Sequence, residues 1–171
     1  MKSADTSPGA DLARRVQAIE DHRAITDLIY RYTEAIRHQR PVDCLDYFTE
    51  DAVVELRHTI PDCPGQSTLH ERFVGRKALA SSFDETAGSS ARIWPMIHNL
   101  RIELDGDRAR ACCVMMSTIW PHGKEYVGEY RDTLRKGPDG WLFTERVFTL
   151  FGDTEGQYPE AAHAAYESVK C

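Results

Sequence analysis

The sequence predicts an α+β fold in which helices pack on one side of a curved antiparallel sheet. Helical spacing of apolar residues prevails up to Ala87, whereas apolar and polar residues alternate through most of the stretch from Trp94 to Phe151. Asp105-Gly106-Asp107 and Gly137-Pro138-Asp139-Gly140 separate alternating stretches, and their glycines supply the positive φ angles that hairpin turns require. The order is therefore helices first and a meander of strands afterwards.

Composition indicates a single globular domain. The chain has 171 residues, of which 42% are hydrophobic and 28% charged, values typical of a protein that buries its own core. The net charge of -6 argues against nucleic acid as a partner, because phosphates require a basic face. No run of about 18 apolar residues occurs, so we expect no membrane span.

Five cysteines, an odd number, occur without CxxC spacing, so we expect neither a zinc cluster nor a closed disulfide framework. Reduced thiols, and an N-terminus without a signal-peptide core, favour a cytoplasmic protein. We divide the chain into a flexible tail (1–10), one domain (11–152) and a C-terminal tail or lid (153–171).

The first helix is expected from about Leu12, with Asp11 as its N-cap. Tyr32 belongs to its apolar stripe and should face the core. Arg37 lies in the last turn, where a cation suits the helix dipole, and Pro41 stops the helix.

Pro41 can open a short second helix that reaches Phe48. Ala52 to His58 then alternates as a strand whose inner face carries Val54, Leu56 and His58, although the position of His58 at the strand end makes exposure equally plausible. We expect an irregular loop from Ile60 to His70, because it holds two prolines and a glycine, and a third helix from Phe73 to Ala87.

The predicted function depends most on the expected strand from Trp94 to Asp107, because it contains His98. Strict alternation places Met96, His98 and Leu100 on one apolar face. His98 is then either a hydrogen-bonded structural histidine or a proton-transfer group in a cavity. Pro95 cannot donate a ladder hydrogen bond, so it indicates an edge, a bulge or the true start of the strand.

The next strand, Arg108 to Trp120, is apolar on both faces. Ala111, Cys113 and Met115 form one set, and the residues between them form the other. A strand of this kind should be covered on both sides, and the simplest second cover is another subunit. We therefore expect a homodimer, or a higher homo-oligomer, that contacts through the sheet.

Two strands complete the domain, from about Glu125 to Lys136 and from Trp141 to Phe151. Alternation in the last strand puts Arg146 among apolar neighbours, and a buried arginine needs an acidic partner such as Asp132 or Asp51. Tyr130 lies on an apolar face of the preceding strand.

Four fragments resemble one family, in its order and spacing. They are AITDLIYRYTEAI, DYFTEDAVVE, NLRIELDGDRARA and GEYRDTLRKGPDGWLFTERV. Together they resemble the SnoaL-like proteins of the nuclear transport factor two superfamily. The resemblance implies a cystatin-like cone, in which a curved antiparallel sheet wraps around N-terminal helices and leaves an apolar cavity.

That family includes polyketide cyclases, scytalone dehydratase and a hexachlorocyclohexane dehydrochlorinase, most of which use no cofactor. The resemblance places the family's helix tyrosine on Tyr32, its last-strand arginine on Arg146, and its fourth-strand tyrosine on Tyr130. It places the aspartate and histidine of the usual dyad on Arg37 and Pro95, so this chain departs from the family there. The nearest imidazole to the histidine position is His98.

A cofactor-free site needs a base, a donor for developing negative charge and an apolar wall. We expect His98 as the base, Tyr32 as the donor and Arg146 as a stabilising cation. We also predict substrate-binding residues in the strands and at the end of the first helix. They are Tyr130, His58, Met115, Trp94, Phe148 and Arg37.

The resulting prediction is a lyase, isomerase or cyclase without cofactor or metal. Its substrate would be a hydrophobic oxygenated small molecule, such as a polyketide, a steroid or an aromatic metabolite. The alternative is a non-catalytic ligand-binding or assembly module of the same fold, which the missing dyad favours. If His98 lies on the outer sheet face, the alternative moves ahead.

Overall fold

The computed structural model describes residues 8–60, 63, 65–88, 90–121 and 123–153. The predicted lid or tail therefore lies almost wholly outside the described residues. Helix α1 (Pro8–Arg37) is followed by a 3-10 helix, η1 (Pro41–Tyr47), and by strands β1 (Phe48–Thr59) and β2 (Ser67–Val74). The second α-helix, α2, spans Arg76–Gly88. Strands β3 (Arg92–Asp105), β4 (Arg108–Trp120), β5 (Lys124–Gly137) and β6 (Gly140–Asp153) follow in the described residues.

The six strands form one curved sheet in the order β2-β1-β6-β5-β4-β3, which does not close into a barrel. All neighbours pair antiparallel except β1 and β6, which run parallel. The prediction of helices on a curved sheet is confirmed, whereas the expectation of a wholly antiparallel sheet is wrong at that one pair. The last strand of the meander, β6, lies beside β1 and runs in the same direction, so the sheet is mixed.

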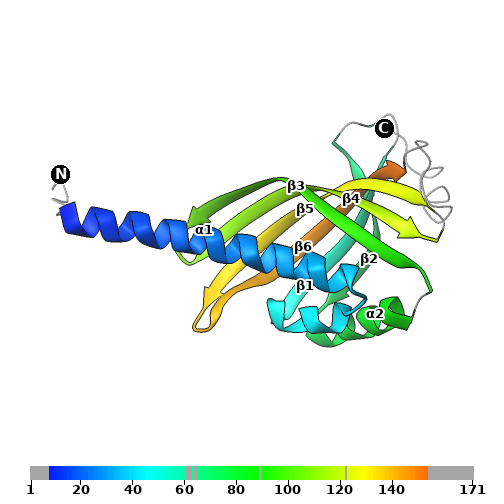
Figure 1. The fold of residues 1–171 in the computed structure, drawn as a ribbon, viewed down its shortest axis with the longest axis horizontal. Helices are drawn as coiled ribbons and strands as arrows, with labels where there is room; N and C mark the ends of the chain where they lie inside the picture. The colour runs from blue at the N-terminus through cyan, green and yellow to red at the C-terminus, as the bar shows by residue number, and fades with distance from the viewer. Residues whose placement is uncertain (1–7, 61–62, 64, 89, 122, 154–171) are drawn as a thin grey trace.

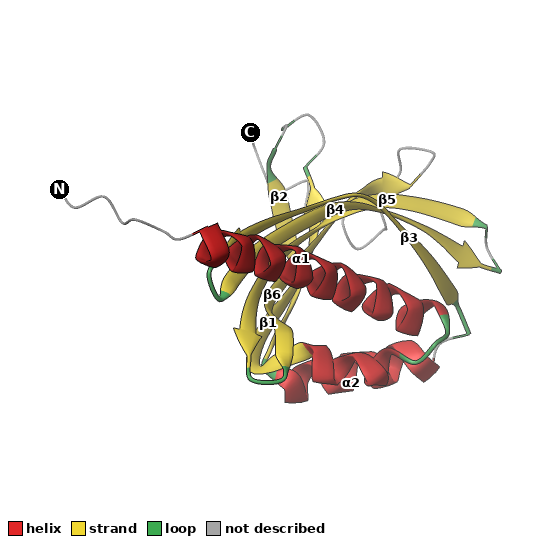
Figure 2. Cartoon of the chain, turned by 60° about the vertical axis from the view of Figure 1, so that its left-hand side comes forward, coloured by secondary structure: helices red, strands yellow, loops and turns green. Residues whose placement is uncertain are grey.

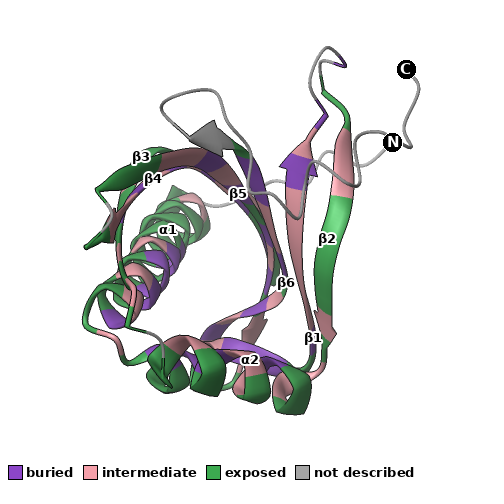
Figure 3. Cartoon of the chain, turned by 90° about the vertical axis from the view of Figure 1, so that its right-hand side faces the viewer, coloured by how far each residue is buried: buried purple, intermediate pink, exposed green. Residues whose placement is uncertain are grey.

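Helix α1 crosses the concave side of the sheet, and α2 covers another part of the same side near η1 and β1 (Figures 1 and 2). The apolar stripe predicted for the first helix is buried at Ile25, Leu28, Ile29 and Tyr32. Figure 3 shows the sheet curving around α1. Helix α1 begins at Pro8 rather than near Leu12, and its first turns project beyond the sheet (Figure 1).

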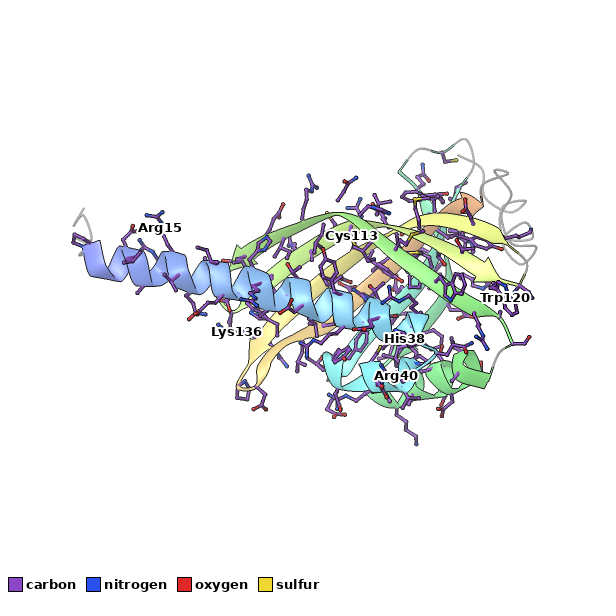
Figure 4. The ribbon with its side chains drawn as sticks, in the orientation of Figure 1. Arg15, His38, Arg40, Cys113, Trp120 and Lys136 are labelled. Carbon is purple, nitrogen blue, oxygen red and sulfur yellow. The ribbon has the colours of Figure 1, made fainter. Side chains whose placement is uncertain are left out.

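A polar contact fixes α1 to the β5–β6 hairpin. The indole of Trp141 donates a 2.9 Å hydrogen bond to Asp21, and the Lys136 ammonium lies 2.6 Å from the same carboxylate oxygen. Figure 4 shows Lys136 beside α1. Burial opposes the charge of Asp21, but the hydrogen bonds from Lys136 and Trp141 outweigh it and lower the pKa of the carboxyl.

One expected loop is partly a strand. Residues 67–74 pair with β1 as an edge strand, although we expected an irregular loop up to His70 and a helix from Phe73. The breakers that predicted the loop end at Gly65, and the following residues include Thr, Leu, Phe and Val, which suit strands. The two expected hairpin turns, after Asp105 and after Gly137, are confirmed.

The described cysteines differ in their oxidation state. Cys44, Cys112 and Cys113 are free thiols, as expected, but Cys63 is disulfide-bonded. The expectation of reduced thiols is therefore wrong for Cys63. Burial raises the pKa of Cys44 and of Cys113 to about 12, so both thiols stay protonated and pack as small apolar groups.

Candidate functional site

A cavity of about 380 Å³ lies on the concave side of the sheet, between the strands and the two α-helices. Most of its wall is apolar, with side chains from β1, β3, β4, β6 and α2. These include Leu56, Phe83, Ile93, Met115, Phe148 and Leu150. A volume of this size lies at the small end of the range of ligand pockets, about 300–1,000 Å³.

His58 is the most deeply buried imidazole in the wall of this cavity. It lies near the end of β1, on the face where alternation predicted it, and only 3% of the residue is exposed. Neither ring nitrogen has a hydrogen-bond partner among the described residues. Burial, and then the proximity of His70, lower the pKa of His58, so the imidazole is neutral at pH 7 and offers one donor and one acceptor.

His70 reaches the same cavity because of a β-bulge. Leu56 pairs with Glu71 and Arg57 pairs with Leu69, which leaves His70 as the extra residue of β2. Its ring stands edge-on to the ring of His58, with the centroids 4.9 Å apart and the planes at 78°. About 31% of its side chain is exposed, so His70 lies at the margin of the cavity and His58 lies deeper.

Hydroxyl groups supply the other polar atoms of the wall. Ser117 on β4 and Tyr126 on β5 are direct cross-strand partners. Tyr130 lies deeper, and burial raises the pKa of its phenol, which keeps it protonated as a possible donor. Tyr130, His58, Met115 and Phe148, which we predicted to bind substrate, line the cavity; their role in binding is a prediction that this geometry does not test.

Arg146 belongs to a second polar cluster, which does not line the cavity. Its Nε and Nη2 atoms each donate a 2.8 Å hydrogen bond to the carboxylate of Asp132. Its guanidinium carbon lies 4.1 Å from the ring centroids of Tyr32 and Phe143 and 4.4 Å from that of Tyr130. The expectation of an acidic partner is thus confirmed, and that partner is Asp132.

Arg146 and Asp132 form a buried ion pair in which only Nη1 of the guanidinium lacks a hydrogen-bond partner among the described residues. Burial opposes the charge of Arg146, but Asp132 outweighs it and the pKa of the guanidinium is raised. Burial also raises the pKa of Tyr32 to about 12. Tyr32 is 9% exposed, packs against Arg146 and is not part of the cavity wall, so its predicted contact with substrate is wrong in geometry.

His98 lies on the outer face of the sheet, and the prediction that it shares a cavity with Arg146 is wrong. His98 pairs with Val114 and Arg101 pairs with Cys112, so Asn99 and Leu100 both face a single residue of β4. Asn99 takes a φ of 52° at this bulge. The extra residue reverses the alternation, so Ile97 faces inward before the bulge and Leu100 after it.

Two further predicted contacts are corrected by the same geometry. Trp94 shares the outer face of β3 and is 45% exposed, and Arg37 is exposed at the end of α1 without reaching the cavity wall. Pro95, onto which the resemblance placed the histidine of the dyad, lines the cavity and has no titratable group.

The C-terminal end of α1 carries a third group of polar side chains. His38 and Glu34 lie 4.0 Å apart and each side chain is 55% exposed; Figure 4 shows His38 and Arg40 at this end of the helix. A pair so open to water contributes little. Among the described residues, no three His, Cys, Asp or Glu side chains gather as a metal-ligand set, and no described helix is long and apolar enough to cross a membrane.

Sequence reasoning missed His70 and Ser117 as cavity residues. Alternation with Cys113 and Met115 would have identified Ser117, because these three lie on one face of β4. No local signal would have identified His70, since its inward direction results from a bulge within a segment that we expected to be a loop.

The curved mixed sheet, the helices on its concave side and the apolar interior cavity define a cone-shaped protein of the cystatin-like, nuclear transport factor two-like class. Within that class the chain belongs to the SnoaL-like domain family, which it matches over residues 17–147. None of the curated proteins compared with the chain matches it.

Three solved structures from Novosphingobium aromaticivorans illustrate the likeness. One is a presumed aromatic ring hydroxylase, with 25% identity, a TM-score of 0.62, and coverage of 77% of this chain and 90% of that one. A presumed scytalone dehydratase has 18% identity, a TM-score of 0.67, and coverage of 83% and 90%. A nuclear transport factor two-like protein with a cystatin-like fold has 22% identity, a TM-score of 0.65, and coverage of 95% and 97%.

Proposed function

We propose that this protein binds a hydrophobic, oxygenated small molecule in the cavity of its cone. One observation carries the proposal: an apolar cavity of about 380 Å³ holds a buried imidazole, His58, without a partner among the described residues. Ligand pockets combine such apolar walls with a few polar groups that fix orientation. The ring-hydroxylase and scytalone-dehydratase names of two neighbours support a cyclic ligand, such as a polyketide, a steroid or an aromatic metabolite.

Binding without turnover is the form of this proposal that the geometry favours. The predicted base, His98, lies on the outer face of the sheet, and Arg146 is held in a buried ion pair with Asp132. The aspartate and histidine of the family's usual dyad are replaced by Arg37 and Pro95. The groups that we assigned to catalysis, His98, Tyr32 and Arg146, therefore do not line the cavity.

A second candidate function is cofactor-independent lyase, isomerase or cyclase chemistry. One observation favours it, namely that an imidazole and a phenol, His58 and Tyr130, share the wall of the cavity. A neutral imidazole can accept a proton while a phenol donates to developing negative charge. Turnover of any cyclisable or dehydratable substrate, lost in His58→Phe and kept in His98→Phe, would place this function first.

Titration with an apolar fluorophore whose emission rises in a dry site tests the binding proposal. We expect saturable binding with one site per chain and displacement by small cyclic compounds. Absence of saturable fluorescence, together with no heat of binding for a panel of aromatic alcohols and ketones, would contradict it.

We also propose a homodimer that contacts through the outer face of the sheet. Trp94 and Met96 on β3 are 45% and 46% exposed there, and Met116 pairs with Met96 on the same face. A second apolar surface lies on α1, where Ile19 is 69% exposed. The proposal concerns the sheet surface and not the helix surface.

Light scattering separates these two surfaces. The wild-type chain should exceed its 19.4 kDa monomer mass at micromolar concentration, Met96→Glu should lower the mass, and Ile19→Glu should not. A wild-type protein that remains at 19.4 kDa, or a dimer lost only in Ile19→Glu, would contradict contact through the sheet.

A further inference from the structure

Two imidazoles from adjacent strands meet at one end of the cavity. His58 is held by β1 and His70 by the bulge of β2. Their rings stand 4.9 Å apart, but no hydrogen bond joins them, and both nitrogens of His58 are without a partner among the described residues. A buried polar atom in this condition destabilises a fold unless something else satisfies it.

Among the described residues, no carboxylate lines the cavity beside the pair. Of the described residues that line the cavity, the titratable ones are His58 and His70 themselves and Tyr126 and Tyr130 from β5. The lining residues from α1, α2, β3, β4 and β6 are apolar or carry only hydroxyls. Glu71, 3.8 Å from His70, is half exposed and approaches only the imidazole at the margin.

Because burial, and then the proximity of His70, lower the pKa of His58, its imidazole is neutral near pH 7 and one of its nitrogens is an acceptor. An acceptor nitrogen in a low-dielectric wall is best satisfied by a neutral O–H donor. A hydrocarbon leaves it unpaired, and a carboxylate brings a charge that must lose its hydration without finding a cation.

We propose that the His58–His70 pair selects ligands that carry an acidic neutral hydroxyl, a phenol or an enol, whose O–H donates a hydrogen bond to His58. The inference rests on the proposed binding function and names the ligand class of that site. No proton is transferred in the bound state: the ligand hydroxyl keeps its proton and donates a hydrogen bond to one imidazole nitrogen, while the other nitrogen keeps its own proton. His70 stands edge-on to His58 at the margin of the cavity and adds to the effect of burial on that imidazole.

Three ligands with one ring system test the proposal: biphenyl, 4-phenylphenol and biphenyl-4-carboxylate. Their affinities are measured by calorimetry and by displacement of the apolar fluorophore at pH 7.5. We expect 4-phenylphenol to bind about tenfold more tightly than biphenyl, the factor that one net hydrogen bond supplies, and the carboxylate to bind most weakly.

Variants locate the selectivity. His58→Phe should reduce the ratio between phenol and hydrocarbon to about one, whereas the matched control His98→Phe, on the outer face, should leave it unchanged. The ratio in the wild-type protein should also fall as the pH is lowered below 6.5, the ordinary pKa of histidine, because a protonated His58 has no acceptor. This pH series needs no variant and keeps the proposal testable if His58→Phe fails to fold.

The possible failures are distinguishable. If neither the fluorophore nor any of the three compounds binds, the proposed function fails and the selectivity fails with it. If all three bind with equal affinity, or if the carboxylate binds best, the cavity is a ligand site but the pair does not select hydroxyls, and the inference is overturned.

Discussion

Two polar clusters lie on the concave side of the same sheet, and their partners distinguish them. In the Asp132–Arg146 cluster, two charges satisfy one another through paired 2.8 Å hydrogen bonds and aromatic rings cover the guanidinium. In the His58–His70 pair, a buried imidazole faces a cavity and neither of its nitrogens has a partner among the described residues. In the first arrangement only Nη1 of Arg146 lacks a hydrogen-bond partner among the described residues, and three aromatic rings cover the guanidinium. In the second, both nitrogens of His58 lack a partner beside a cavity, so we assign the first to stability and the second to binding.

Breaking the Asp132–Arg146 ion pair should have the largest effect on stability. Arg146→Met leaves Asp132 charged and buried, and the loss of one member of such a pair costs about 3–5 kcal/mol of unfolding free energy. The double variant Asp132→Leu with Arg146→Met should recover much of that loss, because no unpaired charge remains. Urea denaturation measures both, and a loss below about 1 kcal/mol, the size of an exposed pair, would show that the cluster is not a structural ion pair.

Removing the unpartnered imidazole should have a smaller effect of opposite sign. His58→Phe replaces a buried ring whose nitrogens lack partners among the described residues, so we expect unchanged stability or a gain of about 1 kcal/mol. The same denaturation experiment checks this. A loss of about 2 kcal/mol or more, as for a hydrogen-bonded buried side chain, would mean that His58 supports the fold.

The pH dependence of stability should show the smallest effect and should depend on the same histidine. The folded-state pKa of His58 lies below the ordinary value of 6.5, so between the two values the unfolded chain binds more protons than the folded one. Above pH 6.5 His58 is neutral in both states and does not make the unfolding free energy depend on pH. As the pH falls from 6.5 toward the folded-state pKa, protonation of His58 in the unfolded chain lowers the unfolding free energy. Thermal denaturation from pH 7.5 to 5 should show this slope in the wild-type protein, and a slope unchanged in His58→Phe would contradict the assignment.

Asp21 provides the acid-side control for that series. Its pKa is lowered from 3.8, so its contribution persists through the range in which His58 titrates and is lost only as the pH falls below about 3.8. Asp21→Asn should therefore change the stability at pH 7.5 without changing the slope near pH 6.

The fold could be predicted largely from the sequence because its main elements have strong periodicity. The apolar stripe of α1, which includes Tyr32, and the alternation of β4, which includes Met115, are local sequence patterns, and the structure buries the residues that they predict to be buried. The strand β2 was missed because Pro61, Pro64 and Gly65 dominate the segment before it. The parallel pairing of β1 with β6 was missed because it joins two distant segments.

The site could be predicted only in part, because two bulges decide which histidines face inward. A bulge at Asn99 turns His98 to the outer face, and a bulge at His70 brings that residue to the cavity. Strict alternation assumes that every strand residue has one partner, and a single extra residue reverses the face of the residues on one side of it. His58 lies on a regular part of β1, so alternation placed it on the inner face, although its position at the strand end left exposure equally plausible.

The most direct test of the account is the affinity of the apolar fluorophore for two neighbouring variants of β4. Met115 lies in the cavity wall, whereas Val114 points to the outer face. Met115→Trp fills the cavity and should weaken binding by about tenfold or more, since a tenfold loss corresponds to about 1.4 kcal/mol, while Val114→Trp should leave the affinity unchanged. If Val114→Trp abolishes binding and Met115→Trp does not, the ligand site lies on the outer face and the assignment of the cavity is wrong.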